Sequence, residues 1–246
     1  MNKFCLSFCF FVAISIPVSG ARADEITVSA AASLKDVLTT LSAAYSRQSA
    51  TQTRFNFGSS GTLQRQIEAG APVDLFIAAA AKNLDALAAQ NEIEMVTRRT
   101  LARGELVLIA PHGSKLRSFS DLRGANIQSI SLGGPGVPAG DYARQTLRFL
   151  RLDTVLGAKF VLAKDVRAVL NQVAVGNADA GFVYKTDALT SKNVRIVASA
   201  PPKSHTPVVY PMAIVTNAPD RAGALGFWRY LQTPGAKHTL KKFGFK

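Results

Sequence analysis

The chain has 246 residues, with 29 lysines and arginines against 16 aspartates and glutamates and a formal net charge of +13. A basic protein can meet nucleic acid, an anionic membrane surface or an acidic solute. Its cations are scattered, however, apart from one cluster near the C-terminus at Lys237, Lys241, Lys242 and Lys246. We therefore expect the charge to serve solubility and expect no nucleic-acid partner.

The first 23 residues have the pattern of a secretory signal peptide. Lys3 precedes an apolar run over residues 4–18, and Ala21-Arg22-Ala23 forms an A-x-A cleavage site. The run is shorter than the roughly 20 residues that span a membrane. Cleavage after Ala23 predicts an exported, periplasmic protein. The signal also carries both cysteines, Cys5 and Cys9, so we expect no disulfide, thiolate metal site or cysteine nucleophile in the mature chain.

Short runs of β-forming residues then alternate with segments of helical periodicity. The expected strands cover residues 26–30, 53–57, 73–78, 105–110, 130–132, 160–163, 181–184, 194–198 and 208–215. The expected helices cover residues 34–45, 62–69, 82–90, 139–150, 166–173, 220–232 and 234–243. We find no fixed-period repeat. This alternation predicts an α/β protein with largely parallel sheets, as one large domain or two smaller ones.

Polar residues gather where the first two strands turn into helices, the place where ligands bind in open α/β sheets. Ser33 and Asp36 have the spacing of a helix-capping box, so Ser33 either only caps its helix or also faces a ligand. Gly58-Ser59-Ser60-Gly61-Thr62 offers several N–H and O–H donors around one point, which is typical of an anion cradle. It lacks the lysine of a Walker A loop and the G-x-S-x-G of a nucleophile elbow, and an ordinary flexible turn is the alternative.

Three later turns add to this pattern. Residues 133–140 are rich in glycine and proline, which indicates a rigid loop whose backbone approaches another group closely. Asp165 is expected to cap the helix that begins at Val166. Tyr184 ends a strand with a hydroxyl available, either for a ligand or for a bond within the protein.

Signals for catalysis are weak. His112, His205 and His238 lie in unrelated contexts, and none has the H-x-x-x-H spacing of a zinc site. No serine lies in a recognised activating motif. A Ser-His-Asp arrangement is spatial and leaves no sequence pattern, so an exported serine hydrolase stays as an alternative. We expect a protein that is not an enzyme and holds no cofactor.

The same turns resemble those of the periplasmic molybdate-binding proteins of ABC transporters. The likeness covers essentially the whole mature chain. It is carried by Ala30–Leu34 (AAASL), Gly58–Thr62 (GSSGT), Gln66–Phe76, Val137–Gly140 (VPAG), Asp165–Arg167 (DVR), Tyr210–Pro211 and the C-terminal Phe243–Phe245. In one departure, the segment before Val137 is shorter than in the family and lacks its acidic residue.

The resemblance implies a two-lobed periplasmic-binding-protein fold of type II, each lobe a mixed, mostly parallel sheet flanked by helices, with the ligand in the cleft. Lobe 1 would comprise residues 24–104 and 210–246, and lobe 2 residues 105–209. The family's ligand contacts map onto Ser33, Ser60, Ala139, Val166 and Tyr184.

The ligand implied is molybdate, and tungstate with it, delivered by a monomeric binding protein to an ABC permease in the inner membrane. The metal enters as the oxyanion and contacts no protein atom as a bare ion. We expect neutral donors at helix starts to hold the dianion, and Arg167 to have a structural or electrostatic role. Another tetrahedral oxyanion or a chelated metal is the alternative ligand.

Overall fold

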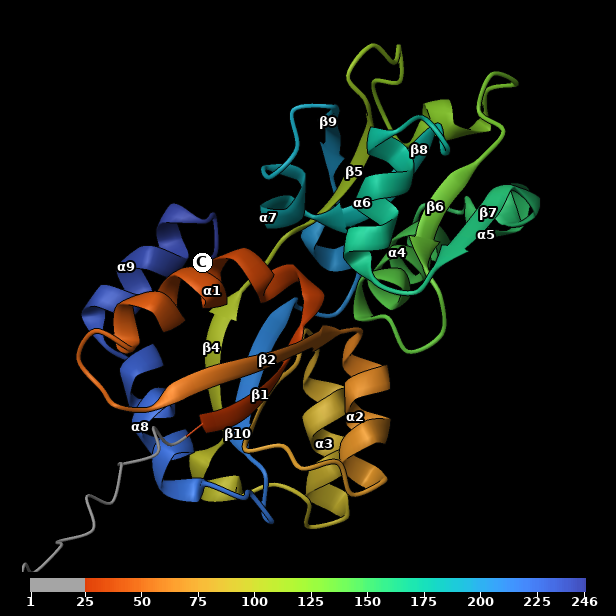
Figure 1. Cartoon of the computed structure of the whole chain (residues 1–246). Helices are drawn as coiled ribbons and strands as arrows, with labels where there is room; N and C mark the ends of the chain where they lie inside the picture. The colour runs from red at the N-terminus through yellow and green to blue at the C-terminus, as the bar shows by residue number, and fades with distance from the viewer. Residues whose placement is uncertain (1–24) are drawn as a thin grey trace, which may run out of the picture.

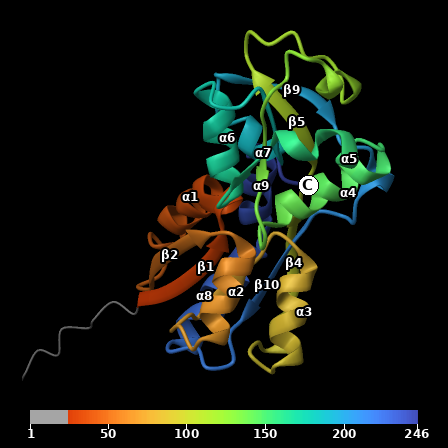
Figure 2. The same ribbon diagram turned by 90° about the vertical axis from the view of Figure 1, so that its right-hand side faces the viewer.

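The computed structural model describes residues 25–246, so the predicted signal peptide lies outside the described residues. The chain forms two lobes, each built on a five-stranded sheet with helices packed against it (Figure 1). Figure 2 shows the two lobes one above the other, with α1 directly below α6. The predicted α/β fold with two lobes is confirmed. Among residues 25–246, no helix is long and apolar enough to cross a membrane.

The sheet of the first lobe has the strand order β2-β1-β3-β10-β4. Its strands are β1 (Glu25–Ala31), β2 (Gln52–Gly58), β3 (Leu75–Ile77), β4 (Arg99–Arg103) and β10 (Val209–Ile214). Helices α1 (Lys35–Tyr45), α8 (Arg221–Leu231) and α9 (Pro234–Lys242) lie together on one face. Helices α2 (Ser60–Glu68) and α3 (Ala81–Ala89) cover the other face.

The sheet of the second lobe has the order β7-β6-β8-β5-β9. Its strands are β5 (Leu106–Pro111), β6 (Ile130–Gly133), β7 (Phe160–Ala163), β8 (Ala180–Tyr184) and β9 (Val194–Ser199). The helices are α4 (Pro138–Phe149), α5 (Asp153–Leu156), α6 (Val166–Ala174) and α7 (Lys185–Ala188). The short segments that join these elements include five 3₁₀ helices, of which Ala32–Leu34 leads from β1 into α1.

The chain crosses between the lobes twice, from β4 to β5 and back from β9 to β10. In each sheet, the strand that arrives from the other lobe runs antiparallel to its neighbours. β10 is antiparallel to β3 and β4, and β5 is antiparallel to β8 and β9, whereas β1 and β6 pair in parallel with their neighbours. Both sheets are therefore mixed, with four strands in one direction.

Apolar residues on β3 alternate between two cores. Leu75 and Ile77 belong to the large core that extends under α1, α8 and α9, while Phe76 and Ala78 pack with Leu63 under α2 and α3. All three β3 residues and the following Ala78 are fully buried, as expected for a strand covered by helices on both faces. This two-sided burial fixes where the strand ends point, and thereby where the loops after them lie.

Two local expectations were incomplete or wrong. Strand β4 was not predicted, because Arg99, Thr100 and Arg103 are exposed and leave only Leu101 and Ala102 as an apolar signal. The capping box at Ser33 is wrong: Ser33 lies inside the 3₁₀ helix, and neither helix start has a side-chain cap there. Asp36 instead forms an ion pair with Arg167 of the other lobe.

Candidate functional site

The five residues singled out from the sequence lie together around one small cavity between the lobes. Loops after β1, β2 and β3 line it from the first lobe, and the starts of α4 and α6 and the end of β8 from the second. The cavity is small in this arrangement of the lobes, with a volume of about 10 Å³, close to what one water molecule needs. Its lining comprises Ala31, Ala32, Ser33, Gly58, Ser59, Ser60, Ala79, Val137, Pro138, Ala139, Asp165, Val166 and Tyr184.

Ser33 presents a buried hydroxyl at the start of the first helix. The residue is 3% exposed, and no hydrogen bond of standard geometry reaches its Oγ from the described residues. The buried Tyr210 phenol is its polar neighbour, and the Ser33 hydroxyl lowers the pKa of that phenol against the larger effect of burial. A buried hydroxyl without a partner costs free energy, about 1–3 kcal/mol on mutational scales. The absence of a capping bond therefore leaves this hydroxyl free to bind a group in the cavity.

Ser60 begins α2 and presents its hydroxyl from the second loop. The preceding Ser59 caps the helix, since its Oγ accepts a hydrogen bond from the Thr62 N–H at 3.2 Å. The Ser60 Oγ accepts a bond from the Ala79 N–H at 2.9 Å. A hydroxyl that accepts in this way still carries its own hydrogen to donate, so Ser60 can act as a donor within the cavity.

Ala139 and Val166 lie in the first turns of α4 and α6, where backbone N–H groups lack partners inside the helix. Pro138 occupies the first position of α4, which suits its fixed φ. The predicted cap of α6 is confirmed, because the Asp165 carboxylate accepts from the Ala168 N–H at 2.8 Å. Each helix start also presents the positive end of its dipole to the cavity.

The glycine-rich loop before α4 makes the close backbone approach that its composition predicted. The Gly61 N–H donates to the Gly136 carbonyl across the lobe boundary at 2.9 Å. A Cβ atom on Gly61 would lie 2.6 Å from that carbonyl oxygen, and Gly136 itself has a φ of +81°. Glycine is required on both sides of this contact, which brings α2 and α4 together beside the cavity.

Tyr184 closes the cavity at the end of β8. It is 1% exposed, and within residues 25–246 its hydroxyl has no hydrogen-bond partner. Burial raises the pKa of this phenol well above its usual value, with smaller contributions from Tyr210, Tyr142 and Asp187. Tyr142 and Tyr210 pack edge-on against its ring. The hydroxyl therefore stays protonated at neutral pH and can donate a hydrogen bond.

Formal charge is nearly absent from the cavity wall. Asp165 is the only lining residue of the Asp, Glu, Lys and Arg types, and its carboxylate accepts the hydrogen bond that caps α6. Arg167 does not line the cavity; its guanidinium pairs with Asp36 and with Asp187, each at 2.6 Å. The wall thus consists of neutral donors, and among the described residues no cluster of His, Cys, Asp and Glu could hold a bare metal ion.

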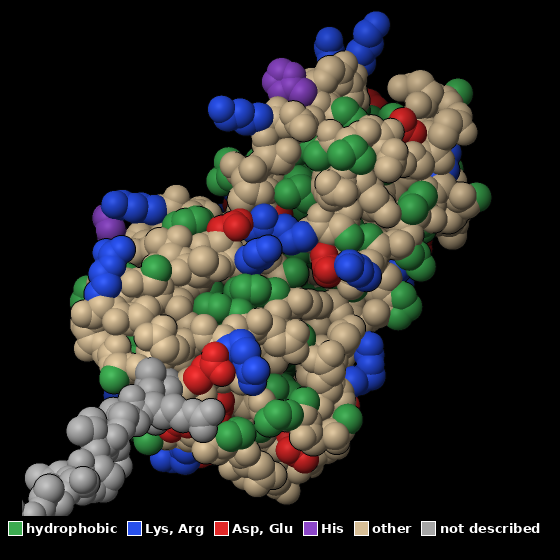
Figure 3. All heavy atoms as spheres, viewed as in Figure 1, with side chains coloured by type: hydrophobic (Ala, Val, Ile, Leu, Met, Phe, Trp, Pro, Cys, Tyr) green, Lys and Arg blue, Asp and Glu red, His purple; other side chains and the backbone are tan. Residues whose placement is uncertain are grey.

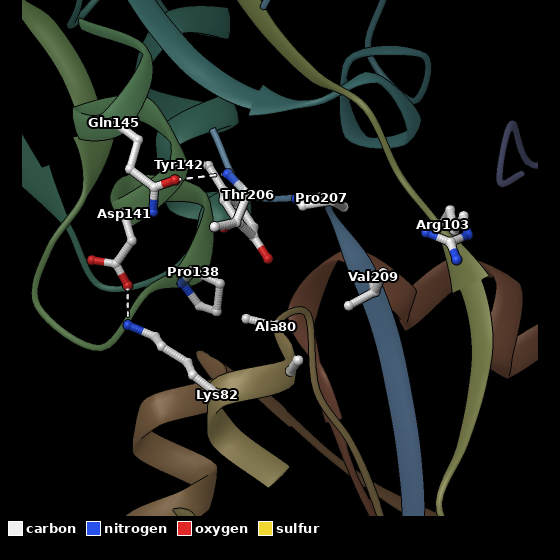
Figure 4. A pocket seen from close by; sticks show the side chains of 11 residues that line it. Ala80, Lys82, Arg103, Pro138, Asp141, Tyr142, Gln145, Thr206, Pro207 and Val209 are labelled. Carbon is white, nitrogen blue, oxygen red and sulfur yellow. Dashed lines mark hydrogen bonds and ion pairs between the residues drawn. The ribbon is translucent and has the colours of Figure 1, made fainter. Parts of the chain in front are cut away.

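A larger pocket of about 490 Å³ shares a lining residue with this cavity and lies near the crossing strands, at Arg103 and Val209. Figure 4 shows the Tyr142 hydroxyl pointing into it, with Lys82 paired to Asp141 at one edge. Pro138 lines both spaces. The Tyr142 hydroxyl also donates to the Ala79 carbonyl at 3.2 Å, which joins the lobes between the two spaces.

Sequence reasoning missed two parts of the wall. Ala79 and Ala31 line the cavity near the ends of β3 and β1, and an alanine side chain has no polar group that would mark it in a sequence. Tyr142 was missed as a residue that joins the lobes. Its position, one turn into the helix after the glycine-rich loop, was the available signal.

Two lobes joined by two crossings, with a small donor-lined cavity between them, define the class of bacterial binding proteins. The chain belongs to the bacterial extracellular solute-binding protein family, whose profile matches residues 26–246.

Similar proteins agree with this assignment. The molybdate-binding protein ModA of Escherichia coli is 39% identical over 243 residues, which is 95% of this chain and 94% of that protein. A Bacillus subtilis lipoprotein, YvgL, assigned as an ABC transporter substrate-binding protein, is 42% identical over 89% of this chain and 85% of its own length. The solved periplasmic molybdate-binding protein of Azotobacter vinelandii superposes with a TM-score of 0.81 at 27% identity, covering 90% of this chain and 98% of that one.

Proposed function

We propose that this protein is the solute-binding component of an ABC importer and captures molybdate, and tungstate with it, as a dianion between its lobes. The observation that carries the proposal is the pair of buried hydroxyls without partners among the described residues, Ser33 Oγ and Tyr184 OH, in one neutral cavity. Ser60, Ala139 and Val166 complete the proposed ligand set. Relatives named as molybdate-binding proteins support the choice of anion.

A wall of donors suits a fully deprotonated tetrahedral oxyanion. The four oxygens of molybdate only accept hydrogen bonds at neutral pH, and well-placed bonds to a charged acceptor contribute about 1.5–3 kcal/mol each. Helix starts add roughly +0.5 charge each, so several together offset much of a double negative charge without any lysine or arginine.

In this proposal the two lobes close around the bound anion. Donors come from both lobes, so ligand binding stabilises the closed arrangement and leaves the open one unchanged. We assign residues 24–104 and 210–246 to lobe 1 and residues 105–209 to lobe 2, which agrees with the membership of the two sheets except at Val209, the first residue of β10. The closed monomer would present both lobes to an inner-membrane permease from the periplasm, after removal of residues 1–23.

Calorimetry of ligand-stripped protein tests this function. We expect molybdate and tungstate to bind tightly, and sulfate and phosphate to compete poorly. The double variant Ser60→Ala with Tyr184→Phe should lose affinity by orders of magnitude, because two donors to a buried dianion are removed. Equal affinity in the parent and the double variant would refute the site. Preferential binding of another oxyanion or of a chelated metal would refute molybdate as the ligand. Labelling of a cavity serine by a fluorophosphonate would indicate that the protein is a hydrolase.

A further inference from the structure

Arg167 joins the two lobes next to the cavity without touching its interior. Its Nη2 lies 2.6 Å from Oδ2 of Asp36, which is in the first turn of α1 in the other lobe. Acidic and basic side chains lie together at the junction of the lobes in Figure 3, and α6 contacts the 3₁₀ helix that carries Ser33. The pair is partly shielded, with Arg167 25% exposed and Asp36 42% exposed.

The guanidinium is already oriented within its own lobe. Its Nε lies 2.6 Å from Oδ1 of Asp187, a carboxylate with no exposed surface, and its Nη1 donates to Thr190 Oγ1 at 3.2 Å. Both partners belong to the segment that begins with α7, in the same lobe as α6. An arginine held on one side by a buried carboxylate loses little further conformational freedom when it meets a second one.

The ion pair acts on the two segments that carry proposed ligand contacts. Asp36 follows Ser33 by three residues, and Arg167 directly follows Val166. When the lobes separate, the Arg167–Asp36 distance must increase, while the Arg167–Asp187 pair stays inside one lobe. Lys82 and Asp141 also pair across the lobes at 2.5 Å, but the Lys82 side chain is 60% exposed and pairs with no second carboxylate among residues 25–246.

We propose that Arg167 is a positioning residue that locks the closed lobes around the ligand by pairing with Asp36, oriented by Asp187. The proposal rests on the proposed function for its ligand. It assigns the pair a role in retaining the anion: the contact forms only as the lobes close, so its loss should accelerate opening more than it slows capture.

Stopped-flow kinetics with molybdate tests this role. The variant Asp36→Asn leaves the buried Arg167–Asp187 pair intact, so the fold should hold. We expect its molybdate dissociation rate to rise about fivefold, with an association rate near that of the parent. Glu94→Gln is the matched control, since Glu94 pairs with Arg221 at 2.5 Å inside one lobe and should leave both rates unchanged. The Asp36→Asn effect should also shrink in 1 M salt, where the parent's own pair is screened.

Small-angle scattering gives a second readout that does not depend on molybdate. Without ligand, Asp36→Asn should have a larger radius of gyration than the parent at low salt, and Glu94→Gln should not. Parent-like dissociation and parent-like size for Asp36→Asn would overturn the proposal. If the parent itself fails to bind molybdate, the proposed function fails, and the scattering comparison alone decides whether Arg167 locks the lobes.

Discussion

At the scale of single residues, the cavity depends on hydroxyls that the fold leaves without partners. Tyr184→Phe removes one such hydroxyl and leaves the buried ring in place. We expect a 10- to 100-fold loss of molybdate affinity, as for the loss of one charge-assisted hydrogen bond, with thermal stability equal to or above the parent's. Calorimetry and a melting curve measure the two effects. Tyr45→Phe, in the first lobe's core, is the control and should keep full affinity.

The tyrosines also predict how stability depends on pH. Burial raises the pKa values of Tyr142, Tyr184 and Tyr210 above their ordinary value near 10. The unfolded chain therefore releases these protons first, and the stability that the neutral phenols confer is complete below about pH 10 and falls as the pH rises beyond it. Ultraviolet titration should show fewer than five tyrosines ionising near pH 10 in the folded protein. If all five tyrosines ionised together near pH 10 while the protein stayed folded, the three phenols would not be buried as described.

At the scale of elements, the start of α2 meets the loop before α4 backbone to backbone. Gly61→Ala places a Cβ 2.6 Å from the Gly136 carbonyl oxygen, and neither main chain can yield as a side chain would. Each lobe should still fold, because alanine favours the helix. Closure should fail, with at least a tenfold loss of molybdate affinity by calorimetry. Gly235→Ala, at the start of α9 with no atom within 4 Å of the new Cβ, should bind as the parent does.

The elements also show how far the sequence can predict the site. Periodicity was sufficient for strands and helices that are buried on one or two faces, such as β3 and α6. It was not sufficient for β4, which lies at the edge of its sheet and pairs with β10. The exposed arginines of β4 interrupt the apolar pattern that would have predicted a strand. The capping pattern at Ser33 was misleading, because Asp36 pairs with Arg167, 131 residues away in the sequence. Contacts between lobes depend on tertiary packing, which no local pattern encodes.

At the scale of the whole molecule, the two crossings make the lobes equivalent in topology. Each sheet receives its one antiparallel strand from the other lobe. A ligand between such lobes contacts both only when they close, so affinity measures closure as well as hydrogen bonding. This is why the cavity residues, the Gly61–Gly136 contact and the Arg167–Asp36 pair are expected to change the same dissociation constant through different rates.

Net charge is also a property of the whole molecule, and we expect it to affect the rate at which the protein captures molybdate. The formal charge is +13 for the whole chain and +11 once Lys3 and Arg22 leave with the predicted signal peptide. It surrounds a cavity lined by neutral donors, so it attracts a dianion at long range and adds little once the ion is bound. We expect the molybdate association rate to fall severalfold between 10 mM and 500 mM salt, as the screening length shortens from about 30 Å to a few ångströms. The triple variant Lys237→Gln, Lys241→Gln, Lys242→Gln removes three exposed cations on α9. It should lower the association rate at low salt only and keep the parent's dissociation rate at every salt concentration. An association rate independent of salt in the parent would show that the charge has no part in capture.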